Sequence, residues 1–389
     1  MLSLNPGNHL PSHPASYYMA TRNAILDYPT LARTVQTQVC VVGGGYSGVN
    51  TALELAERGF DVTLVEARQV GWGASGRNGG QLIRGVGHGT EPFLKYIGAA
   101  GVAAINAMGF EAIELVRHRI AQYDIECDLR WGYCDLANKP AHYRAFEREY
   151  AQLKAQNYAH ELELLPKERM REVVGSDRYC GGLIDWGSGH LHPLNLLLGE
   201  VKAATELGVQ VFEHSPVERI ETLSSGAFNH RVHTAGGAVD CEHLVLCGNA
   251  YVAGLDKTLE GKVLPAGSYV IVTEPLRESE CQQLLPQNMA VCDQRIDLDY
   301  YRLTADRRLL FGGLCNYSGR DPQSITAQLR PNMLRVFPQL KGVGIEFEWG
   351  GMIGIGANRM PQIGRLPGGA YYAQAYSGHG LNASHLAAR

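Results

Sequence analysis

The chain has 389 residues, of which 45% are hydrophobic and 19% charged, a composition typical of a globular protein with a sizeable core. The formal net charge of −4 supplies no basic field for nucleic acid. The nine cysteines contain no C-x-x-C pair, which argues against a disulfide framework and against a metal site.

Residues 1–36 are polar and interrupted by prolines, and we expect them to lie as an arm on the globule. They carry neither the basic cluster nor the apolar run of a secretory signal. No apolar stretch approaches the ~20 residues that a membrane-spanning helix needs. Together with unpaired cysteines, these features predict a cytoplasmic protein without a membrane span.

A strand, a helix and a second strand are predicted between residues 37 and 66. The apolar run 37–42 ends in glycines, residues 46–58 place apolar side chains at helical spacing before Gly59, and residues 62–65 form a second β run. A β-α-β unit of about this length favours a parallel sheet.

The turn between the first strand and the helix reads Gly43-x-Gly45-x-x-Gly48. Gly43 permits the tight turn, Gly45 lets the backbone approach a pyrophosphate, and Gly48 lets helix and strand pack closely. Glu66 ends the next strand, where its carboxylate can accept hydrogen bonds from ribose hydroxyls. A structural turn and a solvated strand end are the plainer alternatives, but the combined pattern predicts a Rossmann-type dinucleotide-binding domain.

The run 73–81 consists of small residues around Arg77. It suits a loop that wraps the pyrophosphate and reaches a flavin ring, so it favours FAD over NAD, with a flexible surface loop as the alternative. A later strand, 244–247, ends in small residues at Gly248 and could bring backbone against the nucleotide from the other side.

Helix formers and charge dominate residues 95–175, and residues 195–207 predict another helix. The β runs at 263–273 and 309–313 suggest a second sheet outside the nucleotide-binding one. Near the C-terminus, a glycine-flanked turn at 376–382 precedes a helix, whose N-terminus can hold the negative charge of a reduced flavin. His379 in this turn either faces the ring or satisfies backbone groups.

In this order, the motifs resemble the D-amino-acid oxidase and glycine/sarcosine oxidase superfamily of FAD-dependent amine oxidoreductases, and most of all its bacterial γ-glutamylputrescine oxidase branch. The likeness is carried by residues 43–48, 66, 73–81, 187–193, 309–313, 349–354, 359–364 and 378–380, with 16–18 in the arm. It implies an α/β (α+β overall) protein with a Rossmann-type FAD-binding domain and a substrate domain built on a mixed or antiparallel sheet.

The resemblance divides the chain into an N-terminal arm (1–36), a discontinuous FAD-binding domain (37–95, 176–255 and 340–389) and a substrate domain (96–175 and 256–339). The stretch 349–356 lacks the cysteine that holds flavin covalently in monomeric sarcosine oxidases, so noncovalent FAD is expected. Asn382 stands where those enzymes have a lysine, which weakens the case for oxygen activation by a lysine. The chain ends at Arg389, a short way into the expected last helix, which indicates a fragment or a truncated form with weaker flavin retention.

The residues expected at the cofactor share small side chains or a place at a strand end. They are Gly43, Gly45, Tyr46, Ser47, Gly48, Glu66, Ala67, Arg68, Gly73, Ala74, Ser75, Arg77, Asn78, Gly79, Gly80, Gln81, Val217, Gly248, Gly378, His379, Gly380 and Leu381. The candidate catalytic residues are His379, Tyr300, Tyr301 and Arg302.

The expected reaction is oxidation of an amine C–N bond, with molecular oxygen as acceptor and an aldehyde, ammonia and hydrogen peroxide as products. Tyr300 and Tyr301 are candidates for an aromatic cage that disfavours ammonium. Arg302 or Arg84 is the candidate cation for the distal end of a γ-glutamylated polyamine. A dehydrogenase with another acceptor, a non-catalytic flavin-binding subunit and a tRNA-modifying flavoprotein remain as alternatives.

Overall fold

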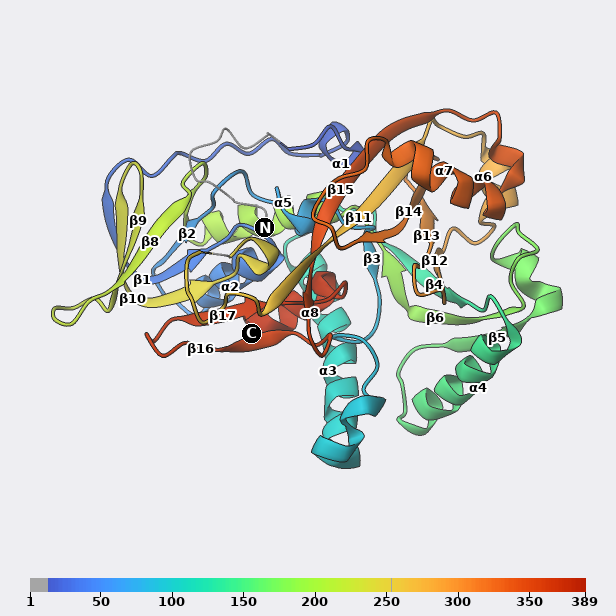
Figure 1. The fold of residues 1–389 in the computed structure, drawn as a ribbon, viewed down its shortest axis with the longest axis horizontal. Helices are drawn as coiled ribbons and strands as arrows, with labels where there is room; N and C mark the ends of the chain where they lie inside the picture. The colour runs from blue at the N-terminus through green and yellow to red at the C-terminus, as the bar shows by residue number, and fades with distance from the viewer. Residues whose placement is uncertain (1–12, 253) are drawn as a thin grey trace.

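Two β-sheets organise the molecule in the computed structural model, which describes residues 13–252 and 254–389 (Figure 1). The first twelve residues of the expected N-terminal arm lie outside the described residues. The first sheet has the order β16-β17-β10-β1-β2-β7, with β8 and β9 attached to β10. Its strands are β1 (Thr34–Val42), β2 (Val62–Val65), β7 (Gln210–Phe212), β8 (Val217–Thr222), β9 (His230–Thr234), β10 (Ala238–Leu246), β16 (Gln362–Arg365) and β17 (Tyr371–Gln374).

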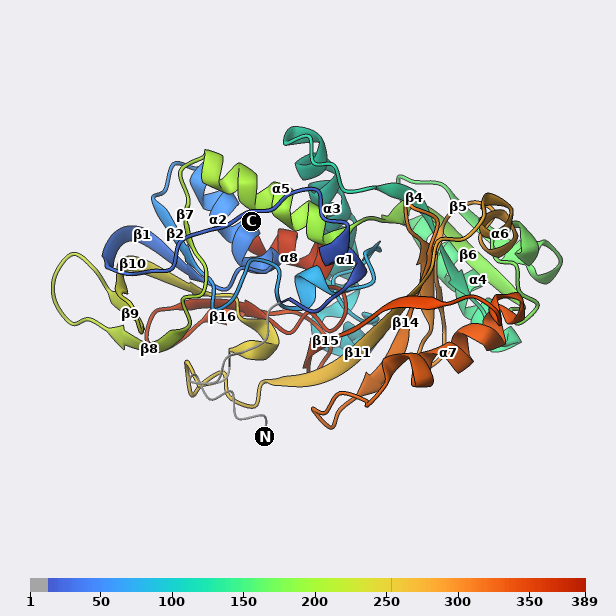
Figure 2. The same cartoon turned by 90° about the horizontal axis from the view of Figure 1, so that it is seen from above.

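The centre of the first sheet is parallel, because β1 pairs in the same direction with β10 and with β2. The predicted β-α-β unit is therefore confirmed. Its helix is α2 (Tyr46–Glu57), which packs against α5 (Pro193–Glu206) and α8 (Gly380–Ala388) (Figure 2). The helix predicted at 195–207 thus begins two residues earlier, at a proline whose fixed φ suits the first helical turn.

The second sheet has the order β15-β11-β14-β13-β12-β4-β6-β3, with β5 paired to β6. Its strands are β3 (Gln81–Leu82), β4 (Arg130–Leu136), β5 (Leu162–Pro166), β6 (Gly181–His190), β11 (Val263–Thr273), β12 (Ala290–Asp293), β13 (Tyr300–Leu303), β14 (Leu309–Asn316) and β15 (Ile345–Gly356). The sheet is mixed, because β12 and β4 run parallel while the other pairs are antiparallel. The predicted fold class is confirmed.

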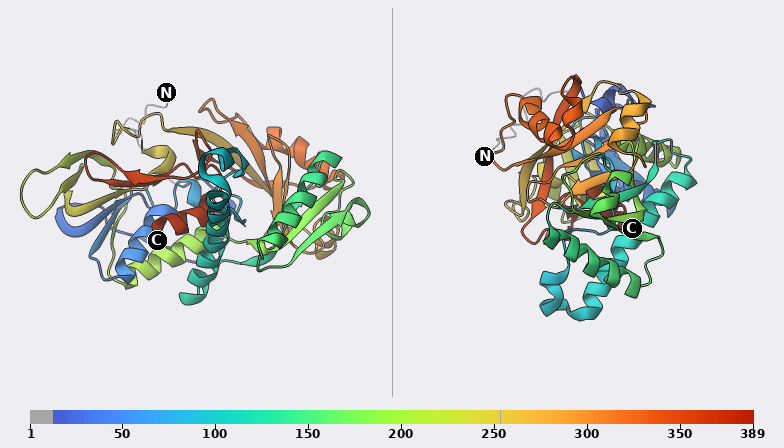
Figure 3. Two further views of the ribbon diagram at one scale, coloured as in Figure 1. Left: turned by 90° about the horizontal axis from the view of Figure 1, so that it is seen from below. Right: turned by 90° about the vertical axis from the view of Figure 1, so that its right-hand side faces the viewer.

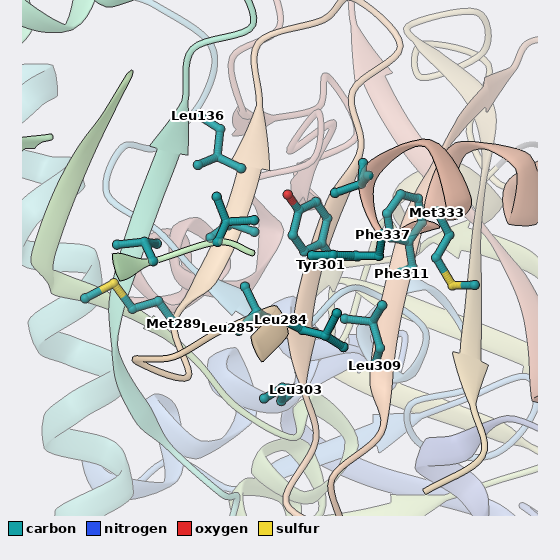
Figure 4. Packing of buried hydrophobic residues seen from close by; sticks show 14 of the residues in the cluster. Leu136, Leu284, Leu285, Met289, Tyr301, Leu303, Leu309, Phe311, Met333 and Phe337 are labelled. Carbon is teal, nitrogen blue, oxygen red and sulfur yellow. The ribbon is translucent and has the colours of Figure 1, made fainter. Parts of the chain in front are cut away.

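The remaining helices complete the layers. They are α1 (Tyr17–Ala20), α3 (Leu94–Gln122), α4 (Pro140–Ala155), α6 (Glu278–Leu284) and α7 (Ile325–Val336), with 3-10 turns η1 (Ala74–Gly76), η2 (Glu91–Phe93), η3 (Lys167–Glu172), η4 (Asn249–Tyr251) and η5 (Pro338–Leu340). Helix α7 packs on β11, β14 and β15, and α4 on β5 and β6. Between α7 and the second sheet lies a core that includes Tyr301, Phe311 and Phe337 (Figure 4).

Membership of the sheets does not follow the expected division of the chain. Strands β6 and β15 lie in ranges assigned to the FAD-binding domain but belong to the second sheet. Helix α3, assigned to the substrate domain, packs against α8 beside the first sheet. The division into domains stays a prediction.

Helix α3 also corrects the expectation about apolar stretches. Among the described residues, the helical stretch Glu91–Gln122 is long and apolar enough to cross a membrane, by length and composition only. Its first end projects from the body of the molecule (Figures 1 and 3), with Leu94 and Tyr96 exposed. Core helices of globular proteins pass the same test, so this finding does not make it a membrane span.

Candidate active site

A cavity of about 690 Å³ is lined by residues from both sheets. The first sheet contributes the ends of β1 and β2, the start of β8 and the residues after β10. The second sheet contributes β3, β11, β12, β13, β14 and β15. A cavity of this size is typical of small-molecule and cofactor sites. The candidate active site is therefore built where the two sheets meet.

Backbone forms the floor of the cavity at the start of α2. Gly43 has φ +116°, which favours glycine, and a Cβ on Gly48 would lie 1.8 Å from the Gly43 oxygen. A Cβ on Gly45 would lie 2.9 Å from Ser75 Oγ, and Ser75 Oγ accepts a hydrogen bond from the Tyr46 N–H at 2.9 Å. This space and the positive end of α2 fit a pyrophosphate.

Glu66 follows β2 and lines the cavity beside the glycine turn. Its carboxylate accepts hydrogen bonds from the Gly44 N–H at 2.5 Å and the Arg68 N–H at 2.8 Å. Burial raises the pKa of Glu66, and these two backbone donors oppose the rise. The carboxylate is held in one orientation, with oxygen lone pairs left for ribose hydroxyls.

The segment predicted to wrap the cofactor joins the two sheets. Arg77 donates to the Trp72 oxygen at 2.6 Å and to the Gly350 oxygen of β15 at 3.2 Å, and its own carbonyl accepts from Trp349 Nε1 at 2.8 Å. Gln81 Nε2 donates to the Val291 oxygen of β12 at 3.0 Å. The segment is therefore an ordered wall of the cavity rather than a flexible surface loop.

All the residues expected at the cofactor line the cavity except Gly48 and Gly80. Gly48 permits the close approach of α2 to the turn, as described above. Gly80 has φ +70°, and a Cβ there would lie 2.2 Å from the Leu191 oxygen. Both glycines thus shape the backbone behind the lining.

At the other side of the cavity, His379 caps the start of α8. It follows Gly378, whose φ is +98°. Among the described residues, His379 Nδ1 is buried without a hydrogen-bond partner. Burial lowers the pKa of His379 to about 4, so its imidazole is neutral at pH 7. The unpaired ring nitrogen and the helix N-terminus, which also lines the cavity at Gly380 and Leu381, fit the polar edge of a flavin.

His88 was missed by the sequence analysis, although it is flanked by Gly87 and Gly89 just as His379 is flanked by glycines. Its ring lies 5.1 Å from that of His379, and its Nε2 is 2.9 Å from the Ser377 oxygen. Burial lowers the pKa of His88 as well. The flanking glycines were the signal that could have identified it.

The two neighbouring tyrosines point to opposite faces of β13. Tyr300 lines the cavity, whereas Tyr301 is fully buried in the core under α7 and donates to Tyr179 Oη at 2.9 Å (Figure 4). Alternation along a strand requires this, because successive side chains face opposite ways. The structure brings only Tyr300 to the candidate cage.

Neither arginine considered for the substrate lines the cavity. Arg302 is buried and donates to neutral acceptors: the backbone oxygens of Gly79, Leu191 and Leu303 and the Tyr18 hydroxyl. Arg84 pairs with three carboxylates, those of Asp185 (2.8 Å), Glu149 (2.5 Å) and Asp135 (3.7 Å). Their donors are engaged in contacts within the protein, so neither guanidinium is available to a substrate.

No group of three or more His, Cys, Asp or Glu side chains among the described residues suits a metal ion.

Comparison with known proteins agrees with this geometry. The profile of the family "DAO: FAD dependent oxidoreductase" matches residues 38–389. The "Gamma-glutamylputrescine oxidoreductase" of Escherichia coli is 42% identical over 379 residues, which are 97% of this chain and 88% of that protein. The "Probable oxidoreductase OrdL" of Haemophilus influenzae is 40% identical over 97% of this chain and 87% of that protein.

Solved structures share the fold. Glycine oxidase from Geobacillus kaustophilus superposes with a TM-score of 0.76 at 21% identity, over 91% of this chain and 93% of that one. L-proline dehydrogenase from P. horikoshii superposes with a TM-score of 0.75 at 20% identity, over 91% and 92% of the two chains.

Proposed function

The chain belongs to the DAO family of FAD-dependent oxidoreductases, and on that premise we propose that it oxidises γ-glutamylputrescine or a similar γ-glutamylated polyamine. The observation that carries the proposal is the identity, along nearly the whole chain, to a relative named for this substrate. The reaction converts the terminal R–CH2–NH2, with water and oxygen, to R–CHO, ammonia and hydrogen peroxide, and so belongs to polyamine catabolism. All nine cysteines are free, which fits the cytoplasmic location that we also propose.

The charges around the cavity support an amine substrate that reacts in its neutral form. Among the described residues, six of those lining the cavity carry a formal charge: Glu66, Arg68, Arg77, Glu218, Asp297 and Arg359. The lining from the middle of the second sheet, including Ser268, Cys292, Tyr300 and Leu314, is uncharged. An uncharged, partly apolar wall disfavours ammonium and lowers the pKa of a bound amine.

Bound FAD supplies the acceptor for the hydride that leaves the carbon next to nitrogen. The protein binds and orients: Tyr300 and its neighbours hold the amine end, and the two neutral histidines add no positive charge that would repel a substrate cation on entry. The resulting imine is hydrolysed by water to the aldehyde and ammonia. Positioning of this kind accounts for a large part of such catalysis.

Oxygen as the acceptor is part of the proposal. Asn382 occupies the place where the resemblance has a lysine, and its Nδ2 donates to the Gly85 oxygen at 2.8 Å. No cation stands at that position, so a dehydrogenase that uses another acceptor is the second candidate function. The two differ in whether peroxide forms.

The test is a substrate panel on the purified flavoprotein. We expect the highest kcat/KM for γ-glutamylputrescine, with aldehyde, ammonia and peroxide formed in equal amounts, and lower values for putrescine, sarcosine and D-alanine. A higher value for sarcosine or D-alanine would refute the substrate class. Reduction of an artificial acceptor without peroxide would replace the oxidase by the dehydrogenase, and no turnover of any kind would favour a non-catalytic flavin-binding subunit.

A further inference from the structure

Three loops of the second sheet expose part of the cavity lining to solvent. This exposed lining comprises Ile296 and Asp297 after β12, Tyr317 after β14 and Arg359 after β15. Ile296 is fully exposed and Tyr317 is 55% exposed, although both line the cavity. We call these four residues the mouth.

Arg359 presents a free cation at the mouth. Its backbone is fixed, since its N–H donates to the Gly356 oxygen at 2.9 Å and its oxygen accepts from the His88 N–H at 3.3 Å. Its φ of +57° lies in the left-handed region, a strained conformation for arginine that often marks functional sites. Within residues 13–252 and 254–389, no hydrogen bond or ion pair engages the guanidinium.

Asp297 presents a free anion on the same mouth. It is exposed, and no ion pair engages its carboxylate in the described part of the chain. The neighbouring Arg295 forms ion pairs with Asp293 and Asp299 and none with Asp297. Hydrogen bonding to Cys315 is the main cause that raises the pKa of the Tyr317 phenol. The charge of Asp297 also raises this pKa and the charge of Arg359 lowers it, so both charges lie close to Tyr317.

We propose that Arg359 and Asp297 bind the α-carboxylate and the α-ammonium of a γ-glutamyl end group, and thereby set specificity for capped over free diamines. The inference rests on the proposed function and names the residues that recognise the distal end of its substrate. The reacting amine enters the uncharged part of the cavity, so the zwitterionic end of a long substrate is left at the mouth. There one cation and one anion without other partners match its two charges.

The experiment measures kcat/KM of each variant on each of three substrates. Three substrates are compared: γ-glutamylputrescine, an analogue without the α-carboxylate (4-aminobutanoyl-putrescine) and one without the α-amine (glutaryl-putrescine). For Arg359→Gln we expect kcat/KM to fall about 10-fold on γ-glutamylputrescine and to stay unchanged on the analogue without the carboxylate. For Asp297→Asn we expect kcat/KM to fall about 10-fold on γ-glutamylputrescine and to stay unchanged on the analogue without the α-amine.

The control is Arg320→Gln, which removes one positive charge from an exposed residue three positions after Tyr317 that does not line the cavity. It should leave kcat/KM unchanged on all three substrates. A second readout is independent of turnover: γ-glutamyl-butylamide keeps the α-amine and α-carboxylate but lacks the terminal amine that is oxidised. Its Kd, followed by the change in flavin absorbance, should rise about 10-fold in Arg359→Gln.

Three results would overturn the inference. Equal losses on γ-glutamylputrescine and its analogues would mean that Arg359 acts on the structure and not on the carboxylate. Unchanged kcat/KM and Kd in both variants would show that the mouth does not recognise the end group, while the proposed function stands. An unmodified protein that does not oxidise γ-glutamylputrescine would refute the proposed function itself, before any variant is made.

Discussion

At the scale of single residues, the cofactor site depends on positions that carry no side chain. Gly43, Gly44 and Gly45 line the cavity with backbone alone, and a Cβ on Gly44 would lie 3.1 Å from the Glu66 carboxylate. Close approach of backbone to phosphate leaves no room for substituents, so we expect side chains at these positions to block binding.

Gly45→Val should abolish FAD binding, because the branched side chain meets Ser75 and fills the space above the start of α2. The measurement is the ratio of flavin to protein absorbance after purification. Gly342→Val is the matched control, since nothing lies within 4 Å of a Cβ there. A folded Gly45→Val protein with full flavin content would contradict this role of the turn.

The pH dependence of the reaction belongs to the substrate amine and not to His379. With its pKa lowered to about 4, His379 is neutral from about pH 5 upward and contributes no ionisation step near 6.5. A primary amine ionises near ~10.4, so kcat/KM should rise about 10-fold per pH unit between about pH 6 and pH 9. The same rise of kcat/KM with pH should persist in His379→Asn. If the unmodified protein shows an ionisation near pH 6.5 in this profile and the variant does not, His379 would be the catalytic base.

Residue types alone could predict which residues line the candidate cofactor site, but not which side chains are available to a substrate. Gly43, Gly45 and Glu66 were predictable because spacing along one β-α-β unit encodes their geometry. The choice between Tyr300 and Tyr301 was not predictable. Alternation along a strand places the two side chains on opposite faces of the sheet, but it does not say which face is the core. Arg302 and Arg359 show the same limit, because only tertiary packing decides which guanidinium is used internally.

At the scale of elements, Arg84 ties the segment after β3 to the second sheet. Its carboxylate partners come from β4 (Asp135), α4 (Glu149) and β6 (Asp185). Burial lowers the pKa of Arg84, but the charges of Glu149, Asp185 and Asp135 and the hydrogen bond to Glu149 together outweigh burial and raise it, so Arg84 is charged at any ordinary pH. The same segment carries Ile83 and His88 into the cavity lining, so this anchor positions one side of the substrate site.

Arg84→Met should destabilise the protein by about 3 to 5 kcal/mol, because it leaves buried carboxylates without their cation. The loss is measured as a lower unfolding temperature followed by flavin fluorescence. Arg171→Met is the control, since Arg171 and Asp177 form a pair with side chains 66% and 81% exposed, and its removal should leave the melting curve unchanged. Equal effects of the two substitutions would contradict the anchoring role.

Elements of the first sheet were predicted better than those of the second for a physical reason. The parallel strands β1 and β2 follow local turn and helix signals, whereas β15 finds its partner far away in sequence. Strand β15 pairs along its length with β11, more than 70 residues earlier. A local pattern predicts a strand but not which sheet it joins.

At the scale of the whole molecule, the cavity that fits FAD lies between the two sheets. The strand of the second sheet that meets Arg77, β15, contains no cysteine. Three cysteines line the cavity: Cys247 directly after β10, Cys292 in β12 and Cys315 in β14. Burial raises the pKa of Cys292 well above its usual range, which keeps it a weakly nucleophilic thiol. We therefore expect no bond between the protein and the flavin.

Precipitation with acid should leave all yellow FAD in the supernatant. A yellow pellet would contradict noncovalent binding, and Cys247→Ser, Cys292→Ser and Cys315→Ser would then show which of these thiols carries the flavin. Because this measurement needs no substrate, it tests the cofactor site separately from the reaction.

The central claim is that the chain oxidises a γ-glutamyl-capped diamine, and the reductive half-reaction tests it without regard to the electron acceptor. The oxidised protein is mixed with substrate in the absence of oxygen, and the loss of flavin absorbance near the visible maximum is followed in one turnover. The account predicts rapid and complete bleaching by γ-glutamylputrescine and bleaching at least about 10-fold slower by putrescine at equal concentration. Flavin that stays oxidised with γ-glutamylputrescine, or that is bleached faster by putrescine, sarcosine or D-alanine, would contradict it.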